Sequence, residues 1–227
     1  SPTEGAPTVR QITMSPKTVG CYVDLSRKLM IQSSPDAEEI FRNDMVMQIA
    51  SAVDSVAING GGSNEPTGIL QTSGIGASNM GDNGLAPTWE SVVNNVREVS
   101  IDNALGGNLA FLTNPKVAAK MRNVVRVAST DSKMILGDKN ELFGYPIHLT
   151  TLVPSNLTKG TSSGVCSAMI FGNFNDLVIG EWGALDVLFD PYTNSAQGAM
   201  RVTAFMDCDI AVRHAQSFSA TQDYLTT

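Results

Sequence analysis

The sequence predicts an α+β fold, because helical patterns gather in the first half of the chain and strand patterns gather in the second. One helical segment that starts near residue 35 is about twice as long as an average helix, and short β-type segments follow residue 145. The chain has 227 residues, of which 42% are hydrophobic and 16% charged. This length and composition are typical of a globular chain with one large domain or two modest ones.

The first two predicted elements are an extended segment and a long helix. Residues 9–30 alternate apolar and polar side chains, which predicts an extended segment. Ser34 is a favourable N-cap, and Pro35 suits the first helical position. The helix ends at Asn59, before three glycines, so its 25 residues would span about 37 Å. Its apolar residues form two sets on different sides of the helix, so we expect other parts of the protein to cover this helix on more than one side. The first set is Phe41, Met45, Ile49, Val53 and Val56, and the second is Ile40, Met47, Ala50, Ala57 and Ile58.

The remaining elements are shorter. A loop rich in Gly and Asn over residues 72–86 precedes a helix that Thr88 caps and that runs to about Ala104. An apolar strand over 109–113 leads into a helix that starts at Asn114-Pro115 and ends near Val124. Five further strands are predicted at residues 145–153, 165–171, 177–180, 185–189 and 200–212.

Charge and composition exclude several classes of function. There are 22 acidic and 15 basic residues, a net charge of −7, which argues against a protein that binds nucleic acid through its phosphates. The basic residues that do cluster are interpreted as a solvated face, or as a face that meets acids on a neighbouring subunit: Lys116, Lys120, Arg122, Arg126, Lys133 and Lys139. No apolar run approaches the roughly 20 residues of a membrane span. Three widely spaced cysteines fit neither a disulfide framework nor a zinc ribbon.

Candidate catalytic residues are few. Residues 160–164 spell G-x-S-x-G, but a nucleophile elbow needs a strand before the serine and a helix after it, whereas this stretch lies between predicted strands. His148 and His214 fall in predicted strands without metal ligands nearby in sequence. An enzyme hypothesis stays open, in which Cys166 or Cys208 works with either histidine. Its most specific form is a cysteine or serine hydrolase that uses Cys166, Ser162 and a histidine. Residues 74–79 fail as a dinucleotide fingerprint, so no cofactor and no metal are predicted.

Several stretches in one order are similar to a known family. The long helix that ends in Ile58-Asn59-Gly60-Gly61-Gly62, followed by Glu65-Pro66-Thr67-Gly68-Ile69-Leu70, resembles the spine helix and glycine loop of the major capsid proteins of tailed bacteriophages, the Hong Kong 97-type family. Later stretches follow the same order: Asn114-Pro115-Lys116, Leu142-Phe143-Gly144-Tyr145-Pro146-Ile147, Ile170-Phe171-Gly172-Asn173-Phe174 and a closing strand with Arg201. The matching positions are expected to be structural: Gly60, Gly61, Gly62, Glu65, Pro66, Gly68, Asn114, Pro115, Gly144, Pro146, Gly172 and Arg201.

The resemblance implies a Hong Kong 97-type capsid fold with a peripheral domain and a mixed α/β axial domain. Residues 1–62 would hold the end of an extended loop and the peripheral domain, residues 63–200 the axial domain, and residues 201–227 the strand that returns to the peripheral domain. Residues 1–7 look like a cut through a flexible stretch, and the family's N-terminal arm and most of its extended loop would be missing, so we expect a monomer or small oligomer rather than full shells.

The resemblance also implies a function without catalysis. The chain would be the shell subunit of a phage or prophage, assembled in the bacterial cytoplasm from pentamers and hexamers of itself. Its partners would be other copies, a portal, a scaffold or maturation protease, and packaged DNA that it contacts without sequence-specific binding; no membrane partner is expected. An encapsulin nanocompartment, which shares this fold, is the close structural alternative.

Overall fold

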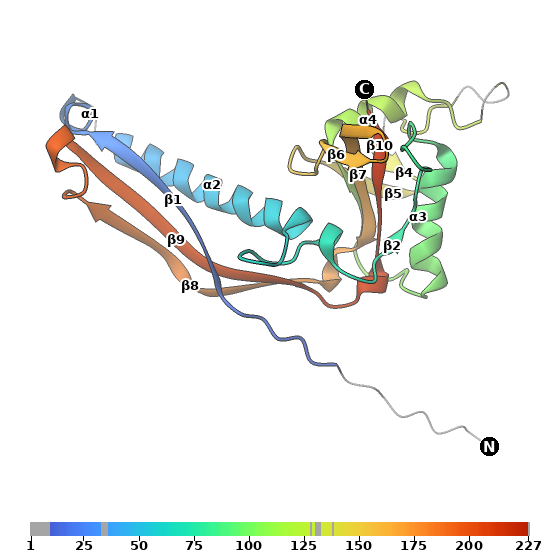
Figure 1. Cartoon of the computed structure of the whole chain (residues 1–227), viewed down its shortest axis with the longest axis horizontal. Helices are drawn as coiled ribbons and strands as arrows, with labels where there is room; N and C mark the ends of the chain where they lie inside the picture. The colour runs from blue at the N-terminus through green and yellow to red at the C-terminus, as the bar shows by residue number, and fades with distance from the viewer. Residues whose placement is uncertain (1–9, 33–35, 128, 130–132, 138, 227) are drawn as a thin grey trace, which may run out of the picture.

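A computed structural model describes residues 10–32, 36–127, 129, 133–137 and 139–226, which form two lobes joined side by side (Figure 1). The first lobe is a long helix, α2 (Asp36–Asn59), packed on a three-stranded antiparallel sheet with the strand order β1-β9-β8. These strands are β1 (Lys17–Ser26), β8 (Leu177–Asp190) and β9 (Ala199–Val212). We call this half of the molecule the sheet lobe.

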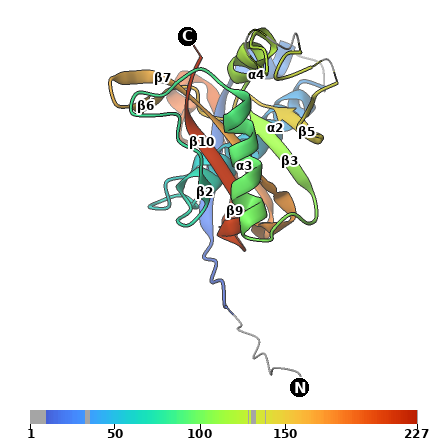
Figure 2. The same cartoon turned by 90° about the vertical axis from the view of Figure 1, so that its right-hand side faces the viewer.

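The second lobe, which we call the mixed lobe, is built on a larger sheet with the order β2-β10-β7-β3-β5-β4, to which β6 adds by pairing with β7. Its strands are β2 (Gly76–Ala77), β3 (Leu109–Thr113), β4 (Glu141–Leu142), β5 (Tyr145–Leu149), β6 (Leu157–Lys159), β7 (Ser162–Asn173) and β10 (Phe218–Leu225). Helices α3 (Trp89–Ile101) and α4 (Pro115–Asn123) pack on it, and Figure 2 shows α3 in front of the sheet. Short 3-10 turns lie at Ile69–Gln71, Phe174–Asp176, Ser195–Gln197 and Ala215–Ser217.

Three apolar cores stabilise the described part of the molecule, one in each lobe and one between them. One lies between α3, α4 and the larger sheet, and includes Phe111 and Phe171. A second fills the space between α2 and the three-stranded sheet. The third joins the lobes, because Ile58 at the end of α2 packs in one cluster with Ile170 and Phe218 of the larger sheet. The junction between the lobes is therefore a packed core.

Most predicted elements are confirmed. The predicted long helix is α2, with 24 residues; its predicted cap Ser34 and first residue Pro35 lie outside the described residues. Thr88 caps α3 as predicted, because its side chain accepts a hydrogen bond from the Ser91 amide. Asn114 caps α4 in the same way, through the Val117 amide at 2.9 Å. The strand predicted over 109–113 is β3.

Some predicted boundaries are wrong. The extended segment stops at Ser26 and gives way to a short helix, α1 (Arg27–Gln32), whose residues are good helix formers and whose Leu29 amide donates to the Ser26 hydroxyl. The two strands predicted at 177–180 and 185–189 are parts of one strand, β8. The pairing of β8 with β9 shifts register at a bulge between Trp182 and Asp186, and the strand continues beyond it. The strand predicted to reach residue 153 stops at Leu149.

The strands that follow residue 176 divide between the two sheets. β8 falls within the stretch expected to be axial, yet it pairs with β9 in the sheet lobe. β10, which the sequence did not predict, follows the returning strand but pairs with β7 in the mixed lobe. The chain thus crosses between the lobes more often than a simple out-and-back path would require.

Candidate functional site

The glycine loop after α2 forms a tight turn between the two lobes, and we call residues 60–70 the joint. The Gly68 amide donates to the Gly60 carbonyl at 2.9 Å, and Gly61 bridges to Thr67. A Cβ on Gly60 would lie 2.2 Å from the Pro66 carbonyl oxygen, and one on Gly68 would lie 2.5 Å from the Gly60 nitrogen. Because these neighbours are backbone atoms that cannot swing aside, both positions require glycine.

Side chains fix the joint to both neighbouring elements. The Glu65 carboxylate accepts a hydrogen bond from the Gly61 amide at 2.7 Å, and the Glu65 carbonyl accepts one from Lys17 Nζ of β1, also at 2.7 Å. Gln71 donates from Nε2 to Asn59 Oδ1 at 3.0 Å, which ties the chain beyond the joint to the last residue of α2. The motif positions at residues 60–68 therefore come together in one structure, which sets the angle at which α2 meets the mixed lobe.

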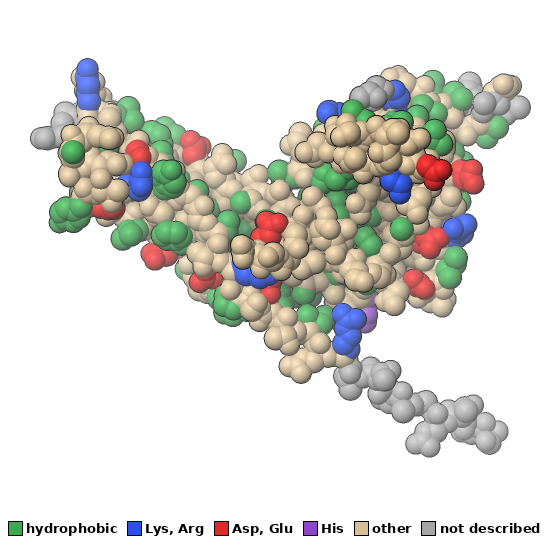
Figure 3. All heavy atoms as spheres, viewed as in Figure 1, with side chains coloured by type: hydrophobic (Ala, Val, Ile, Leu, Met, Phe, Trp, Pro, Cys, Tyr) green, Lys and Arg blue, Asp and Glu red, His purple; other side chains and the backbone are tan. Residues whose placement is uncertain are grey.

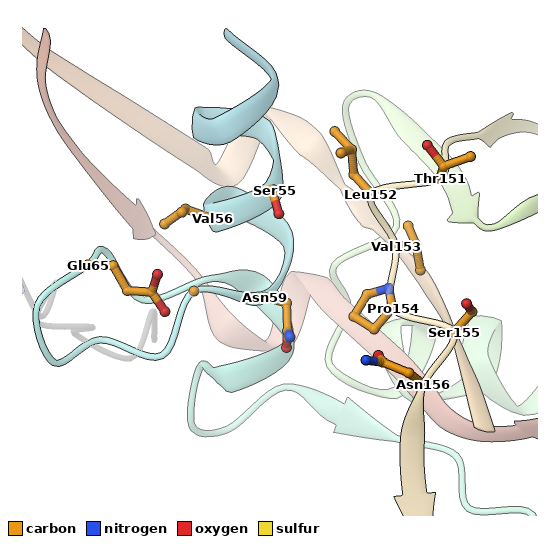
Figure 4. A pocket seen from close by; sticks show the side chains of 11 residues that line it. Ser55, Val56, Asn59, Glu65, Thr151, Leu152, Val153, Pro154, Ser155 and Asn156 are labelled. Atoms are coloured by element: carbon orange, nitrogen blue, oxygen red, sulfur yellow. The ribbon is translucent and has the colours of Figure 1, made fainter. Parts of the chain in front are cut away.

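A cleft of about 510 Å³ lies beside the joint. Figure 4 shows the last turns of α2 and Glu65 on one side of it and the loop 151–156 on the other. Asn114 reaches this loop, because its side chain donates to the Pro154 carbonyl at 3.1 Å while it caps α4. Glu65 is the one titratable group among its lining residues, so the cleft offers no pair of titratable groups for acid–base catalysis.

The other motif positions are spread over both lobes. Gly144 is the turn between β4 and β5, and Pro146 lies in β5, where it pairs with Glu141. Gly172 of β7 faces β10 so closely that a Cβ would lie 2.5 Å from the Phe218 ring. Pro115 is the first residue of α4. These residues shape strands and turns and do not gather into a pocket.

Arg201 of β9 organises the far end of the sheet lobe. Its guanidinium donates to both carboxylate oxygens of Asp24 on β1, at 2.7 and 2.8 Å, and lies 4.4 Å above the ring of Tyr22. These hydrogen bonds lower the pKa of Asp24. Nearby, hydrogen bonds from Thr193 and from the Tyr192 amide lower the pKa of Asp190. Both carboxylates are therefore held in the charged form at neutral pH.

The geometry does not favour the hydrolase hypothesis. Residues 160–161 form the turn between β6 and β7, and Ser162 is the first residue of β7, so a strand and not a helix follows the serine. The Cys166 thiol is buried, and burial and the nearby Asp223 raise its pKa, whereas a nucleophilic cysteine needs a lowered one. His148 and His214 are both exposed, and His214 lies just after β9 rather than within a strand. Among the described residues no three His, Cys, Asp or Glu side chains group as a metal site requires.

The sequence missed an exposed apolar surface on the sheet lobe. Tyr22, Leu188 and Phe205 are all more than two-fifths exposed on the face of the sheet that α2 leaves open. Two residues of the second apolar set of the long helix are also exposed, Ile40 at 59% and Met47 at 70%. This side of the first half of α2 is therefore not packed against other described residues, contrary to our expectation. The period-two alternation of residues 199–212 would have revealed the open sheet face.

Comparison with known proteins decides what this architecture is. The model of the phage capsid family matches residues 1–223. The chain belongs to the phage capsid family. It has the Hong Kong 97-type capsid fold, as the sequence indicated. No helix in the described part of the chain combines the length and hydrophobicity needed to cross a bilayer.

Individual relatives support the same assignment. The chain is 24% identical over 209 residues to the major capsid protein of Halomonas phage phiHAP-1; the match covers 92% of this chain and spans about a third (32%) of that protein's length. The capsid of an empty GTA particle matches with a TM-score of 0.71 and 23% identity over 94% of this chain and 75% of the other. The SrpI encapsulin of Synechococcus elongatus PCC 7942 matches with a TM-score of 0.61 and 18% identity over 93% and 75% of the two chains. The family match and the curated relative favour a phage capsid over an encapsulin.

Proposed function

We propose that this chain is the shell-forming region of the major capsid protein of a tailed phage or prophage. Copies of it would assemble through pentamers and hexamers into an icosahedral shell that encloses double-stranded DNA. The family match over nearly the whole chain is the observation that carries this proposal. The shared fold supports it.

The two-lobed architecture suits a shell subunit. Such a subunit must offer different surfaces to different neighbours, so that head-to-tail contacts close into rings and rings into a cage. Here α2, which is about 36 Å long, and the joint hold two unlike lobes in a fixed relation. The sheet lobe would be the peripheral domain, and the mixed lobe would be the axial domain around the five-fold and six-fold axes.

The charge of the chain fits a container for DNA. With a net charge of −7, the chain lacks the excess of Lys and Arg that nonspecific DNA binding requires. A shell that is filled by a packaging motor needs no affinity for its cargo. We infer that DNA is enclosed without sequence-specific binding, that a portal and a scaffold or maturation protease are the other partners, and that assembly takes place in the bacterial cytoplasm.

The test is to express the chain within its natural reading frame and to image the product by negative-stain electron microscopy. Closed particles of uniform size are expected. A folded product that remains a soluble monomer when its scaffold and protease are coexpressed would contradict the proposal.

An encapsulin shell is the second candidate, because an encapsulin shares the fold over most of the chain. Genes for a portal and a terminase beside the reading frame would indicate a phage. A neighbouring gene for a cargo enzyme would indicate an encapsulin.

A further inference from the structure

The cleft beside the joint has the size and the charge of a small ligand site. Its volume of about 510 Å³ lies within the range of about 300–1,000 Å³ that is usual for such sites. Glu65 is the one charged side chain in its lining, and the other polar side chains there are neutral: Ser55, Asn59, Thr151, Ser155 and Asn156. Figure 3 shows the concave surface between the two lobes, where neutral polar side chains and backbone predominate.

The Glu65 carboxylate has capacity for a further donor. Its Oε1 accepts the hydrogen bond from the Gly61 amide at 2.7 Å, and no group in the described part of the chain donates to Oε2. Lys17 Nζ binds the backbone carbonyl of Glu65, at 2.7 Å, rather than the carboxylate, and Lys17 does not line this cleft. Because an ionised carboxylate accepts about four hydrogen bonds, Glu65 can bind a cation that enters the cleft.

The end of α2 adds to the negative potential. In a continued helix the Gly61 amide would donate to the Ala57 carbonyl, but here it donates to Glu65. The last turn of α2 contains no basic residue, so no side chain of the helix offsets the partial negative charge of its C-terminus. The helix end and the carboxylate therefore act together on one side of the cleft.

Apolar side chains complete the lining. Val56, Leu152 and Pro154 are half-buried and Val153 is buried. A ligand that carries a cationic group on an apolar stem matches both kinds of lining. A divalent metal ion matches less well, because calcium takes about six to eight oxygen ligands and the cleft supplies one carboxylate.

We propose that the cleft beside the joint binds a guanidinium or primary ammonium group on an alkyl chain, with the Glu65 carboxylate as its counter-ion. In a shell, this group would come from an Arg or Lys side chain of a neighbouring copy or from a free polyamine. Once bound, the ligand lies between α2 and the loop 151–156 (Figure 4) and braces the joint. The inference goes beyond the proposed function, because one chain holds every lining residue and needs no assembly to bind.

The test compares two probes of the same shape, n-butylguanidinium, which is charged, and n-butylurea, which is neutral. Saturation-transfer NMR on the probe protons measures binding to the soluble chain and to large particles alike. We expect the charged probe to bind about fivefold more tightly than the neutral one, and its affinity to fall as the salt concentration rises.

Two variants locate the site. Glu65→Gln keeps an oxygen for the Gly61 amide but removes the charge, so the affinity for n-butylguanidinium should fall about fivefold. Ser55→Lys places an ammonium group of the chain itself in the cleft, and binding of the probe should be lost. The matched control is Asp44→Asn, which removes an exposed carboxylate of the same helix outside the cleft and should bind like wild type. Circular dichroism checks that each variant folds, and Ser55→Lys carries the test if Glu65→Gln does not fold.

Equal binding of the two probes, or normal binding of n-butylguanidinium by Ser55→Lys, would overturn the inference. Closed particles from the natural reading frame then distinguish the two sources of the cation. If a neighbouring copy supplies it, the probe binds the soluble chain and not the particle; if a free polyamine does, the probe binds both. Failure to form particles would count against the proposed function and would leave the measurement on the soluble chain valid.

Discussion

Gly68→Ala is the substitution that probes the joint most directly. The new Cβ would lie 2.5 Å from the Gly60 nitrogen, 2.6 Å from the Asn59 nitrogen and 2.6 Å from the Val56 carbonyl oxygen. Relaxed contacts between such atoms need about 3.5 Å, and all three neighbours are backbone atoms of α2 or its end. The helix end and the joint must therefore separate, which also strains the hydrogen bond from Gly68 to Gly60.

Overpacking of this kind lowers the free energy of unfolding by about 1–3 kcal/mol. Because the neighbours of this Cβ are backbone atoms, we expect a loss of about 3 kcal/mol for Gly68→Ala. With a urea dependence of about 2–3 kcal/mol per molar, the midpoint of unfolding should fall by about 1 M. Gly106→Ala is the matched control, since nothing lies within 4 Å of its added Cβ and its φ is not positive; its stability should stay equal or rise slightly. Equal midpoints for the two variants in urea titrations followed by circular dichroism would refute this account of the joint.

Further predictions concern single side chains, each measured by urea unfolding. Arg201→Met removes the hydrogen bonds that lower the pKa of Asp24. The midpoint should therefore drop at neutral pH, and the drop should shrink as the pH falls below about 4, the ordinary pKa of an aspartate, because the charged carboxylate is then lost; a drop of undiminished size in acid would contradict this. Burial raises the pKa of Tyr224 to about 12, so wild type should lose stability as the pH rises from about 10 to about 12, and Tyr224→Phe should lose less over that range. At neutral pH the same variant should be about 1 kcal/mol less stable, because the hydroxyl donates to Ser91 at 2.7 Å. Asn114→Ala should cost about 1 kcal/mol or more through the lost helix cap, and an unchanged midpoint would show that the cap does not contribute.

Local sequence patterns were sufficient to predict the helices and strands that have their own capping residues or a clear apolar periodicity. Thr88 and Asn114 cap helices where their side chains predicted it. The glycines of the joint were recognised from their order around Glu65 and Pro66. The structure adds the reason for them, a close approach of two backbone segments at Gly60 and Gly68 that no local pattern expresses.

Elements whose character depends on tertiary contacts were missed. β10 is a central strand between β2 and β7, and its polar residues are buried because they find partners across the lobe. Ser219 donates to Asn95 at 2.8 Å, and Asn95 donates to Thr221 at 2.8 Å. The sequence of residues 218–225 does not show that Asn95 will bond to their side chains, so this stretch resembles an exposed polar segment rather than a buried strand. The apolar side chains on the open sheet face were missed although residues 199–212 alternate, because Tyr22 and Leu188 join that face from strands elsewhere in the sequence.

The central claim is that this chain works by contacting copies of itself. Cryo-electron microscopy of particles made from the natural reading frame tests it most directly. The account predicts a closed icosahedral map in which the sheet lobe and the mixed lobe fit every subunit of the pentamers and hexamers. A folded product that forms no particles and remains monomeric would contradict it.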